Sequence, residues 1–548
     1  MVRSLAGRSG LAALALAALV WISFGGALRN GFVAFDDDRY VYDNPPVAQG
    51  LAPAGIRWAF TTGTEANWHP LTWLSHMADV ELYGLDPAGH HFTNLLLHAA
   101  NAILFFLVLR GLTGRFWPAL LAAALWAVHP LRAESVVWIS ERKDVLSTFF
   151  GLLALGAYGR YAPRGRLGWT APFFALSLMA KPTWVTLPML LLLLDAWPLG
   201  RWPAESWRKL AAEKGPLFLL AAASCAITYA VQRHGGTVQT GEWLPFGARL
   251  GNAAVATVQY LAALFRPLDL ACFYPPQKLS PASIGWALAV LAALTVAAVA
   301  HARQRPWWIV GWLWFLGTLV PMIGLVQVGG QSRADRYTLL PHVGLIVALA
   351  WGLAEIWEKL RRMRAGRRFA SVLPVVMAGL LLVVVGILAG LSRRQTATWR
   401  DSETLFRQAA AATQNNTYML FNLANEYARQ ERWTEAGAAY RAVLEISPDN
   451  PAALNNLAWA LTATVPVAPE AAHEARELSR RATAIGVIPP AALLNTRERT
   501  EAACGDFAAA QATARELLAL AEAAGQAELA EAIRRRLRGY AENPSAVP

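Results

Sequence analysis

The sequence predicts an all-α protein in which a polytopic membrane domain of about eleven spans precedes a soluble α-solenoid. Three observations support this prediction. Apolar runs of spanning length recur through the first two thirds of the chain, and Ala-rich sequence with a helical period follows them. Of the 548 residues, 55% are hydrophobic and only 16% are charged, a balance that soluble domains rarely show. We place the boundary after Leu391, which gives domains 1–391 and 392–548.

The first apolar run, Leu11–Leu28, follows Arg3 and Arg8, and we expect it to be an uncleaved membrane helix. The segment 246–267 is more polar, because it carries Arg249 and Asn252, and we expect it to lie at the membrane interface. The other predicted spans are 95–110, 117–130, 145–160, 170–181, 183–196, 215–232, 284–300, 307–325, 338–357 and 370–391.

The charge distribution orients these spans. The net charge is +12, and the basic residues gather in short loops such as 110–115, 160–166 and 359–368. This is the pattern of cytoplasmic loops, so the charge needs no nucleic-acid partner. An inside N-terminus then puts 31–92, the first outer loop, on the far side of the membrane. The same face receives 129–144, Lys181-Pro182, 268–283, 327–337 and the C-terminal third.

The sequence lacks the motifs of disulfide-stabilised proteins, nucleotide-binding proteins and serine hydrolases. The three cysteines are far apart, with no CxxC pair, so a disulfide framework is not expected. No G-x-G-x-x-G, P-loop or G-x-S-x-G sequence is present, so neither nucleotide use nor serine hydrolysis finds support.

The C-terminal third predicts tetratricopeptide repeats of 34 residues. Small residues at repeat positions 8 and 20 would let paired helices approach closely, and stacked repeats would offer a concave surface to a protein or peptide. The first complete repeat is carried by Leu420, Leu423, Ala424, Tyr427, Ala436 and Tyr440, and a second begins with Leu454, Leu457 and Ala458.

Three consecutive acids, Asp36, Asp37 and Asp38, follow directly on the first span. Carboxylates are costly inside hydrocarbon, so this run is expected at the outer interface. There a carboxylate could activate a hydroxyl for attack on a lipid-borne substrate or bind a metal. The other reading is a solvated cluster that caps a helix.

Basic residues on the same face could hold a phosphate. The loop QVGGQSRADRY brings Arg333 and Arg336 together before a membrane helix, and Arg142, Lys143 and Lys181 are further candidates. The structural alternative is that Arg333 and Arg336 only anchor the helix or pair with Asp335.

Glu134 and four histidines complete the candidate set: His69, His90, His91 and His129. Glu134 could be a catalytic carboxylate or a structural partner of Arg142. The histidines could equally be packing residues, since no helical ligand pair such as H-x-x-x-H appears. A mixed site such as Asp37 with His91 could hold Mg²⁺ or Mn²⁺.

Four segments carry a resemblance to a known family: FVAFDDDRYVYDNPPV, WHPLTWLSHMADVELYGLDPAGHHFTNLLLHAANA, HPLRAESVVWISERKD and ADRYTLLPHVG. They resemble bacterial relatives of the transmembrane-and-tetratricopeptide O-mannosyltransferases, which belong to the C-type glycosyltransferase (GT-C) superfamily. The resemblance implies an active site away from the cytoplasm, a polyprenyl-phosphate sugar as donor, inversion, and an essential acid within Asp36 to Asp38. Metal dependence varies in that superfamily.

The sequence therefore favours a glycosyltransferase of the bacterial inner membrane, with periplasmic repeats that recruit the acceptor or a partner. The alternatives are a non-catalytic, membrane-anchored repeat scaffold and a transporter. A scaffold needs only one or two spans, and a transporter usually places its ionisable residues at mid-membrane in paired halves.

Overall fold

The computed structural model describes residues 2–237, 245–326, 329–363, 372–464, 466–486 and 488–542, and this described chain is helical without a β-strand. It forms two compact units, 1–401 and 402–548. The predicted all-α class is confirmed. The units divide at Asp401–Ser402 rather than after Leu391, because the preceding helix continues to Ala397. Residues 327–328 and 364–368 of the predicted loops lie outside the described residues.

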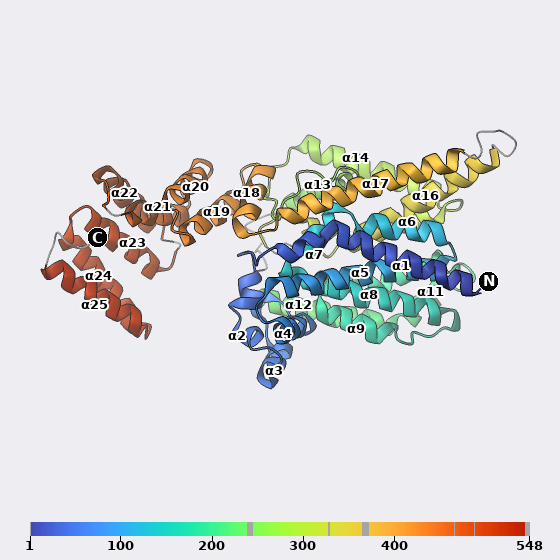
Figure 1. Cartoon of the computed structure of the whole chain (residues 1–548), viewed down its shortest axis with the longest axis horizontal. Coiled ribbons are helices and arrows are strands. Elements are labelled where there is room, and N and C mark those ends of the chain that lie inside the picture. Colours follow the sequence, from blue (N-terminus) through green and yellow to red (C-terminus); the bar gives the residue numbers. More distant parts are fainter. Residues whose placement is uncertain are drawn as a thin grey trace. The chain divides into compact units, whose positions relative to one another are not determined.

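The first unit is a bundle of long helices with a cap of short helices at one end (Figure 1). Its α-helices are α1 (Val2–Phe24), α2 (Pro45–Ala48), α3 (Pro53–Thr61), α4 (Pro70–Tyr83), α5 (Pro87–Thr113), α6 (Phe116–Ala127), α7 (Ala133–Val137), α8 (Arg142–Tyr161), α9 (Thr170–Ala180), α10 (Leu187–Ala196), α11 (Trp207–Glu213), α12 (Gly215–His234), α13 (Phe246–Phe265), α14 (Pro281–Ala300), α15 (Pro306–Leu319), α16 (Pro341–Met363) and α17 (Val372–Ala397).

Several of these helices can cross a bilayer, which makes the chain a multi-pass membrane protein. Among the described residues, five helices are long and apolar enough: Gly7–Arg29, Pro87–Thr113, Gly215–His234, Pro281–Ala300 and Val376–Ala397. A sixth is possible if the bent pair Phe116–Ala127 and Pro130–Val137 forms one span. Our estimate of about eleven also counted shorter segments, such as α9 and α10. The polar segment expected at the interface forms α13, which packs against α14.

Helix α5 shows how the sequence fixes these elements. It begins where the Asp86 side chain accepts a hydrogen bond from the backbone N–H of Ala88 at 3.0 Å, with Pro87 in the first turn. It ends at Gly114, whose φ of +67° is the left-handed conformation that glycine adopts readily. Between these residues α5 packs against α1 and α8, which lie beside it in Figure 1.

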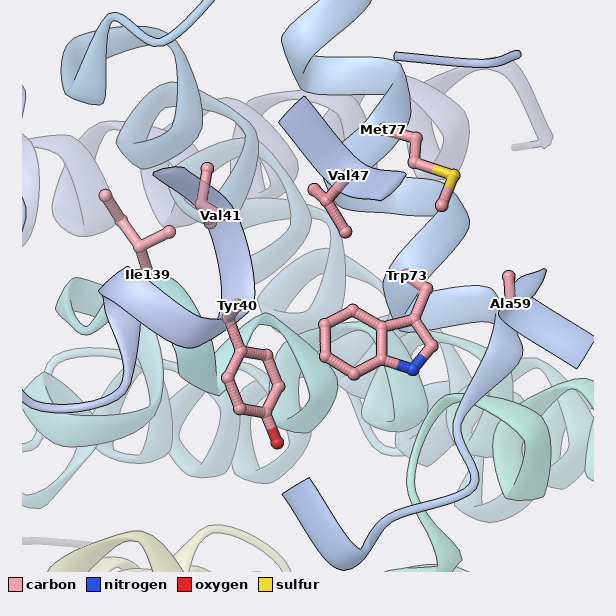
Figure 2. Packing of buried hydrophobic residues seen from close by; sticks show 7 residues of the cluster. All are labelled: Tyr40, Val41, Val47, Ala59, Trp73, Met77 and Ile139. Atoms are coloured by element: carbon pink, nitrogen blue, oxygen red, sulfur yellow. The ribbon is translucent and has the colours of Figure 1, made fainter. Parts of the chain in front are cut away.

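The first outer loop has a small hydrophobic core of its own (Figure 2). Trp73 of α4 stacks on Tyr40 with ring centroids 4.8 Å apart, and Val47 of α2 packs in the same cluster. Ile139 belongs to this cluster although it comes from the segment before α8. Burial of these side chains therefore fixes the loop that carries the three aspartates against the start of α8.

Helices α15 and α16 approach closely because each has a glycine at the contact. A Cβ atom on Gly311 of α15 would lie 3.0 Å from Cβ of Ala348 and would overlap the backbone carbonyl of Gly344. Small residues let membrane helices come this near. The segment between the two helices contains the short 3₁₀ helix η8 (Asp335–Thr338). Arg336 thus belongs to the segment that leads into α16.

The second unit is a solenoid of successive helix pairs. Most of the residues expected at repeat positions are buried, among them Ala424, Ala436 and Tyr440. Its helices are α18 (Ser402–Ala412), α19 (Thr417–Arg429), α20 (Trp433–Ile446), α21 (Pro451–Ala463), α22 (Pro469–Ile485), α23 (Pro490–Ala503), α24 (Phe507–Ala523) and α25 (Ala527–Glu542).

Candidate active site

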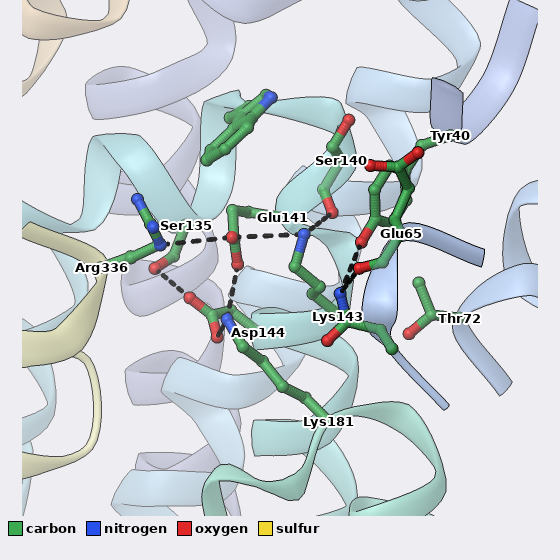
Figure 3. A network of polar contacts seen from close by, with 12 residues as sticks. Tyr40, Glu65, Thr72, Ser135, Ser140, Glu141, Lys143, Asp144, Lys181 and Arg336 are labelled. Atoms are coloured by element: carbon green, nitrogen blue, oxygen red, sulfur yellow. Dashed lines mark hydrogen bonds and ion pairs between the residues drawn. The ribbon is translucent and has the colours of Figure 1, made fainter. Parts of the chain in front are cut away.

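Charged side chains from four distant parts of the first unit meet at one place (Figure 3). One part is the first outer loop, where the short helix η2 (Asp38–Tyr42) follows Asp36 and Asp37. Another is the 3₁₀ helix η5 (Ile139–Glu141) with the first turn of α8. The remaining two parts carry one cation each: Lys181, which follows α9, and Arg336 of η8. Each group lies where a helix begins or ends, so folding of the bundle brings them together.

Glu141 lies at the centre of this cluster and contacts three cations. One of its oxygens is 2.8 Å from Nζ of Lys181, and the other is 3.3 Å from Nζ of Lys143 and 3.4 Å from Nε of Arg336. Burial alone would raise the pKa of Glu141, but the three cations outweigh it and lower that pKa below its usual range. Glu141 is therefore ionised and holds the cations together.

Two further carboxylates balance the cations. Lys181 Nζ also lies 2.8 Å from the Asp144 carboxylate, which accepts a hydrogen bond from the Ser135 hydroxyl at 2.8 Å. Glu134 pairs with the Arg336 guanidinium and accepts the Arg336 backbone N–H at 2.7 Å. Each buried charge thus has an opposite charge beside it.

The three aspartates have different environments. Asp37 is buried, and its carboxylate accepts the Ser140 backbone N–H at 3.0 Å, the Ser140 hydroxyl at 2.5 Å and the Val33 N–H at 3.0 Å. Burial raises the pKa of Asp37 to about 7. Asp37 therefore fastens the outer loop to η5. Asp38 begins η2, where its backbone carbonyl accepts the Asp43 N–H at 2.8 Å.

Asp36 is half-buried and has a φ of +73°, a left-handed conformation that is unusual for a residue other than glycine. Within the described part of the chain, its carboxylate has no hydrogen-bond donor. Burial raises the pKa of Asp36, while the charges of Lys143 and Arg336 oppose this shift. Of the three aspartates, Asp36 has the carboxylate available to a substrate next to the cations.

Aromatic rings surround two of the cations. The Lys143 ammonium lies 4.4 Å from the centroid of the Tyr40 ring and donates to the Ser140 carbonyl at 2.8 Å. Arg336 lies 5.5 Å from the centroid of Trp138. Cation–π contacts of this kind position a cation without neutralising it. Lys143 and Arg336 also pair with Glu141, and they are the two cations whose charges act on the Asp36 carboxylate.

The Trp138 ring also connects the cluster to the end of α17. It stacks on Phe35 at 4.9 Å and on Trp399 at 5.6 Å between centroids. The backbone N–H of Gly31 donates to the Arg400 carbonyl at 2.9 Å, close to the same stack. Residues 399–400 therefore form one wall of this region.

The predicted phosphate ligands Arg142 and Arg333 lie in other networks. Arg142 is buried and donates to Asp79 at 2.5 Å, to the Ser75 hydroxyl at 2.8 Å and to the His90 carbonyl at 2.8 Å. Consecutive helical residues point in directions about 100° apart, so Arg142 and Lys143 face different partners.

Arg333 lies over the Tyr274 ring, 3.5 Å from its centroid. Its neighbour Asp335 accepts the Tyr274 hydroxyl at 3.0 Å, and burial raises the pKa of Asp335 to about 6. Arg333 is 3.9 Å from the Asp335 carboxylate, as the structural alternative expected. Arg333 thus belongs to a network next to the one centred on Glu141.

The four predicted histidines are buried. His69 stacks on Trp73 at 4.7 Å, and burial lowers the pKa of His69 well below its usual value, so the ring is neutral. His90 Nδ1 lies 3.5 Å from Asp79. The Nδ1 atom of His129 accepts the Leu131 N–H at 3.3 Å.

The predicted metal ligands do not fit a metal ion. The Asp37 oxygens already accept three hydrogen bonds, and the described residues contain no group of three or more His, Cys, Asp or Glu side chains arranged to hold a metal. His91 is buried in α5.

Glu141 and Asp144 were not singled out by the sequence reasoning. The run Ser140 to Asp144, SERKD, offered a signal, because five polar residues stand between two apolar segments. Arg142 and Lys143 of this run are predicted phosphate ligands, whereas Glu141 and Asp144 are not among the predicted site residues. Its pairing with Lys181 depends on tertiary packing.

Comparison with known proteins agrees with the resemblance. No model of a known protein family matches the chain. Human protein O-mannosyl-transferase TMTC1 is 25% identical over 82% of this chain and 56% of the human protein. Mouse TMTC1 is 24% identical over 82% of this chain and 59% of its own length. Drosophila Tmtc1 is 32% identical over 36% of this chain and 24% of its own length. The chain thus spans little more than half of the human and mouse proteins, and it is a relative of the protein O-mannosyl-transferases.

Proposed function

We propose that the protein is a membrane glycosyltransferase that moves a sugar from a polyprenyl-phosphate donor to a hydroxyl group on the outer face of the membrane. The observation that carries this proposal is the unpaired Asp36 carboxylate beside Lys143 and Arg336. A base and a phosphate-binding charge are the two groups that such a transfer requires.

Asp36 is the proposed general base. As the acceptor oxygen attacks the anomeric carbon of the sugar, its proton passes to the Asp36 carboxylate. The bond between that carbon and the phosphate oxygen breaks, and the polyprenyl phosphate leaves with the electron pair. Attack from the side opposite the phosphate inverts the configuration. The raised pKa of Asp36 supports this role, because a stronger base takes the proton more readily.

Lys143 and Arg336 are the proposed ligands of the departing phosphate. Negative charge on the phosphate grows as the bond breaks, and fixed cations stabilise that growth. Glu141 contacts both side chains and so keeps them close together despite their mutual repulsion. Lys181 is the third cation of the set and bridges Glu141 and Asp144.

The names of the relatives are the basis for the proposed sugar and acceptor. Their names describe protein O-mannosyl transfer, so we propose a mannosyl group and the hydroxyl of a protein serine or threonine. We further propose a bacterial inner membrane, with residues 402–548 in the periplasm as tetratricopeptide repeats that recruit the acceptor. The positive-inside distribution of the loops supports this orientation. We therefore expect a reporter enzyme that works only in the periplasm to be active when it is fused after Asp401.

The test is transfer of radiolabelled mannose from a polyprenyl phosphate to a Ser- and Thr-rich peptide by the full chain in detergent. Loss of a general base typically costs about 10²–10⁴-fold in rate, so Asp36→Asn should lose at least about 100-fold. The matched control is Asp43→Asn, because Asp43 lies exposed in the same loop. Equal transfer by both variants would refute the role of Asp36. Absence of transfer by the unaltered chain would favour the scaffold alternative.

The rate should also depend on pH in a defined direction. Asp36 acts as a base only when ionised, and its pKa is raised. Transfer should therefore increase as the pH rises through a value above the usual carboxyl range and then level off. A rate that falls over this interval would contradict the assignment.

A further inference from the structure

The loop that joins α8 to α9 borders a cavity of about 580 Å³. Two guanidinium groups, two aromatic rings, a glycine and a proline line it: Arg164, Arg166, Tyr161, Trp169, Gly168 and Pro172. No carboxylate lines this cavity among the described residues. Guanidinium groups match phosphate oxygens, and aromatic rings match apolar groups, so the lining suits an anionic ligand with an apolar part.

The loop has a defined conformation that holds this cavity open. The backbone N–H of Gly165 donates to the Ala162 carbonyl at 2.9 Å, and that of Arg166 donates to the Tyr161 carbonyl at 3.4 Å. Gly168 has a φ of +50°, and a Cβ atom there would overlap the Tyr161 ring. Glycine at this position therefore lets the loop fold closely over the end of α8.

The two arginines of the cavity have no carboxylate partner. In the described part of the chain, no Asp or Glu side chain forms an ion pair with Arg164 or Arg166. The Arg164 guanidinium donates to the Arg160 carbonyl at 3.2 Å. The carboxylate of Glu213, which faces this loop, is already paired with Arg201 at 2.7 Å. The positive charge of the loop is therefore available to a ligand.

The loop lies at the membrane interface opposite the candidate active site. Helix α8 has 20 residues and is therefore about 30 Å long, which is about the thickness of the hydrocarbon core. Lys143 of the candidate site is in its first turn, and the loop follows its last turn. Trp169 is exposed and lies 6.0 Å from Phe173 between ring centroids. Tryptophan is enriched at the level of lipid headgroups, where this position would place it.

A second cavity, of about 310 Å³, lies at the same end of α8. It is an apolar groove between the last turns of α5 and α8, with Arg160 as its one charged side chain among the described residues. The groove exists because Gly111, Gly156 and Gly159 line it without side chains. Arg160 adjoins the loop cavity, since its carbonyl accepts the Arg164 hydrogen bond. An acyl chain in this groove would have its phosphate beside the arginines.

We propose that the loop between α8 and α9 binds an anionic phospholipid of the leaflet opposite the candidate active site. The lipid phosphate accepts hydrogen bonds from Arg164 and Arg166, and Trp169 contacts the glycerol backbone. One acyl chain occupies the groove beside Arg160. Basic pockets between membrane helices are known to select acidic headgroups in this way. The site is at the far end of α8 from Lys143, so this inference stands apart from the proposed sugar transfer.

The test is native mass spectrometry of the full chain in detergent, with phosphatidylglycerol added in increasing amounts. The first phosphatidylglycerol should bind at least about tenfold more tightly than phosphatidylcholine, which has no net charge. Arg164→Ala/Arg166→Ala should remove this preference and weaken phosphatidylglycerol binding at least about tenfold. The matched control is Arg303→Ala/Arg361→Ala, which removes two exposed arginines outside both cavities and should leave binding unchanged.

A second pair of variants tests the acyl-chain groove. A Cβ atom on Gly111 meets no atom within 4 Å, so Gly111→Leu should fold and place its side chain in the groove. It should weaken phosphatidylglycerol binding severalfold. Gly379→Leu on α17 is the matched control, because a Cβ atom there also meets no atom within 4 Å.

Thermal unfolding of each variant, followed by its tryptophan fluorescence, verifies that the chain is folded. The proposal is overturned if the two lipids bind alike, or if Arg164→Ala/Arg166→Ala binds phosphatidylglycerol as tightly as the unaltered chain. An equal loss in the arginine control would also overturn it, because the effect would then come from surface charge in general. Unchanged binding by Gly111→Leu would contradict the position of the acyl chain. Displacement of the lipid by inorganic phosphate at equal concentration would identify a soluble anion as the ligand instead.

Discussion

Replacement of Gly311 by alanine should separate α15 from α16 and so displace Arg336. The added Cβ would overlap the Gly344 carbonyl and lie 3.0 Å from Cβ of Ala348, and the backbone carbonyl cannot rotate away. Such overpacking costs about 1–3 kcal/mol and occasionally more. Alanine gains about 1 kcal/mol over glycine in helix propensity, which offsets part of this cost. We therefore expect a net loss of up to about 2 kcal/mol.

The same helix provides a matched control. Gly317 also lies in α15, and a Cβ atom there would meet no atom within 4 Å. Gly317→Ala should therefore be neutral or slightly stabilising, because only the propensity gain remains. The assay is thermal unfolding in detergent, followed by tryptophan fluorescence, together with mannosyl transfer. Gly311→Ala should lower both the unfolding temperature and the rate. The reasoning is refuted if the two alanine variants behave alike.

Three further predictions concern the buried charges. Glu141→Gln leaves three cations without their shared partner and should cost about 3–5 kcal/mol, whereas Glu65→Gln, in an exposed pair, should cost about 1 kcal/mol or less in the same unfolding assay. The folded-state pKa of Asp37, about 7, lies above its usual 3.8. Its stabilising contribution is therefore complete below about pH 4 and is lost as the pH rises to 7. The unaltered chain should therefore lose stability between pH 5 and pH 8, and Asp37→Asn should lose about 2–3 kcal/mol less over the same interval, as measured by thermal unfolding at both pH values. An equal loss in the two proteins would contradict this prediction. Arg142→Met should destabilise the chain by about 3–5 kcal/mol, because it leaves the buried Asp79 carboxylate without its cationic partner. The double variant Arg142→Met/Asp79→Asn should recover part of that loss in the same unfolding assay.

The all-α class and the membrane segments could be predicted because they depend on composition and period alone. Lys143, Lys181 and Arg336 were identified as a possible phosphate site, since charge on the outer face of a membrane protein is readily seen in a sequence. Arg142 was chosen for the same reason. The side chain of Arg142 points in a different direction from that of Lys143 on the same helix. The composition of the segment does not reveal this direction.

The three aspartates were indistinguishable in the sequence because all three are the same residue type in one run. Their roles separate only through tertiary contacts: Ser140 binds Asp37, whereas Asp36 adopts a positive φ. Glu141 was missed for a related reason. A glutamate near a helix start is common, and its importance here comes from Lys181 and Arg336, which are distant in sequence.

The stack of Trp399 on Trp138 has a consequence for any shortened form of this protein. A chain cut after Leu391 would keep every predicted membrane segment, yet it would lose the indole that covers Trp138 and the Arg400 carbonyl that receives the Gly31 N–H. Such a protein would be inactive for reasons unrelated to acceptor recruitment. Removal of the solenoid alone requires a cut after Asp401, and only that cut would reveal whether catalysis can proceed without it.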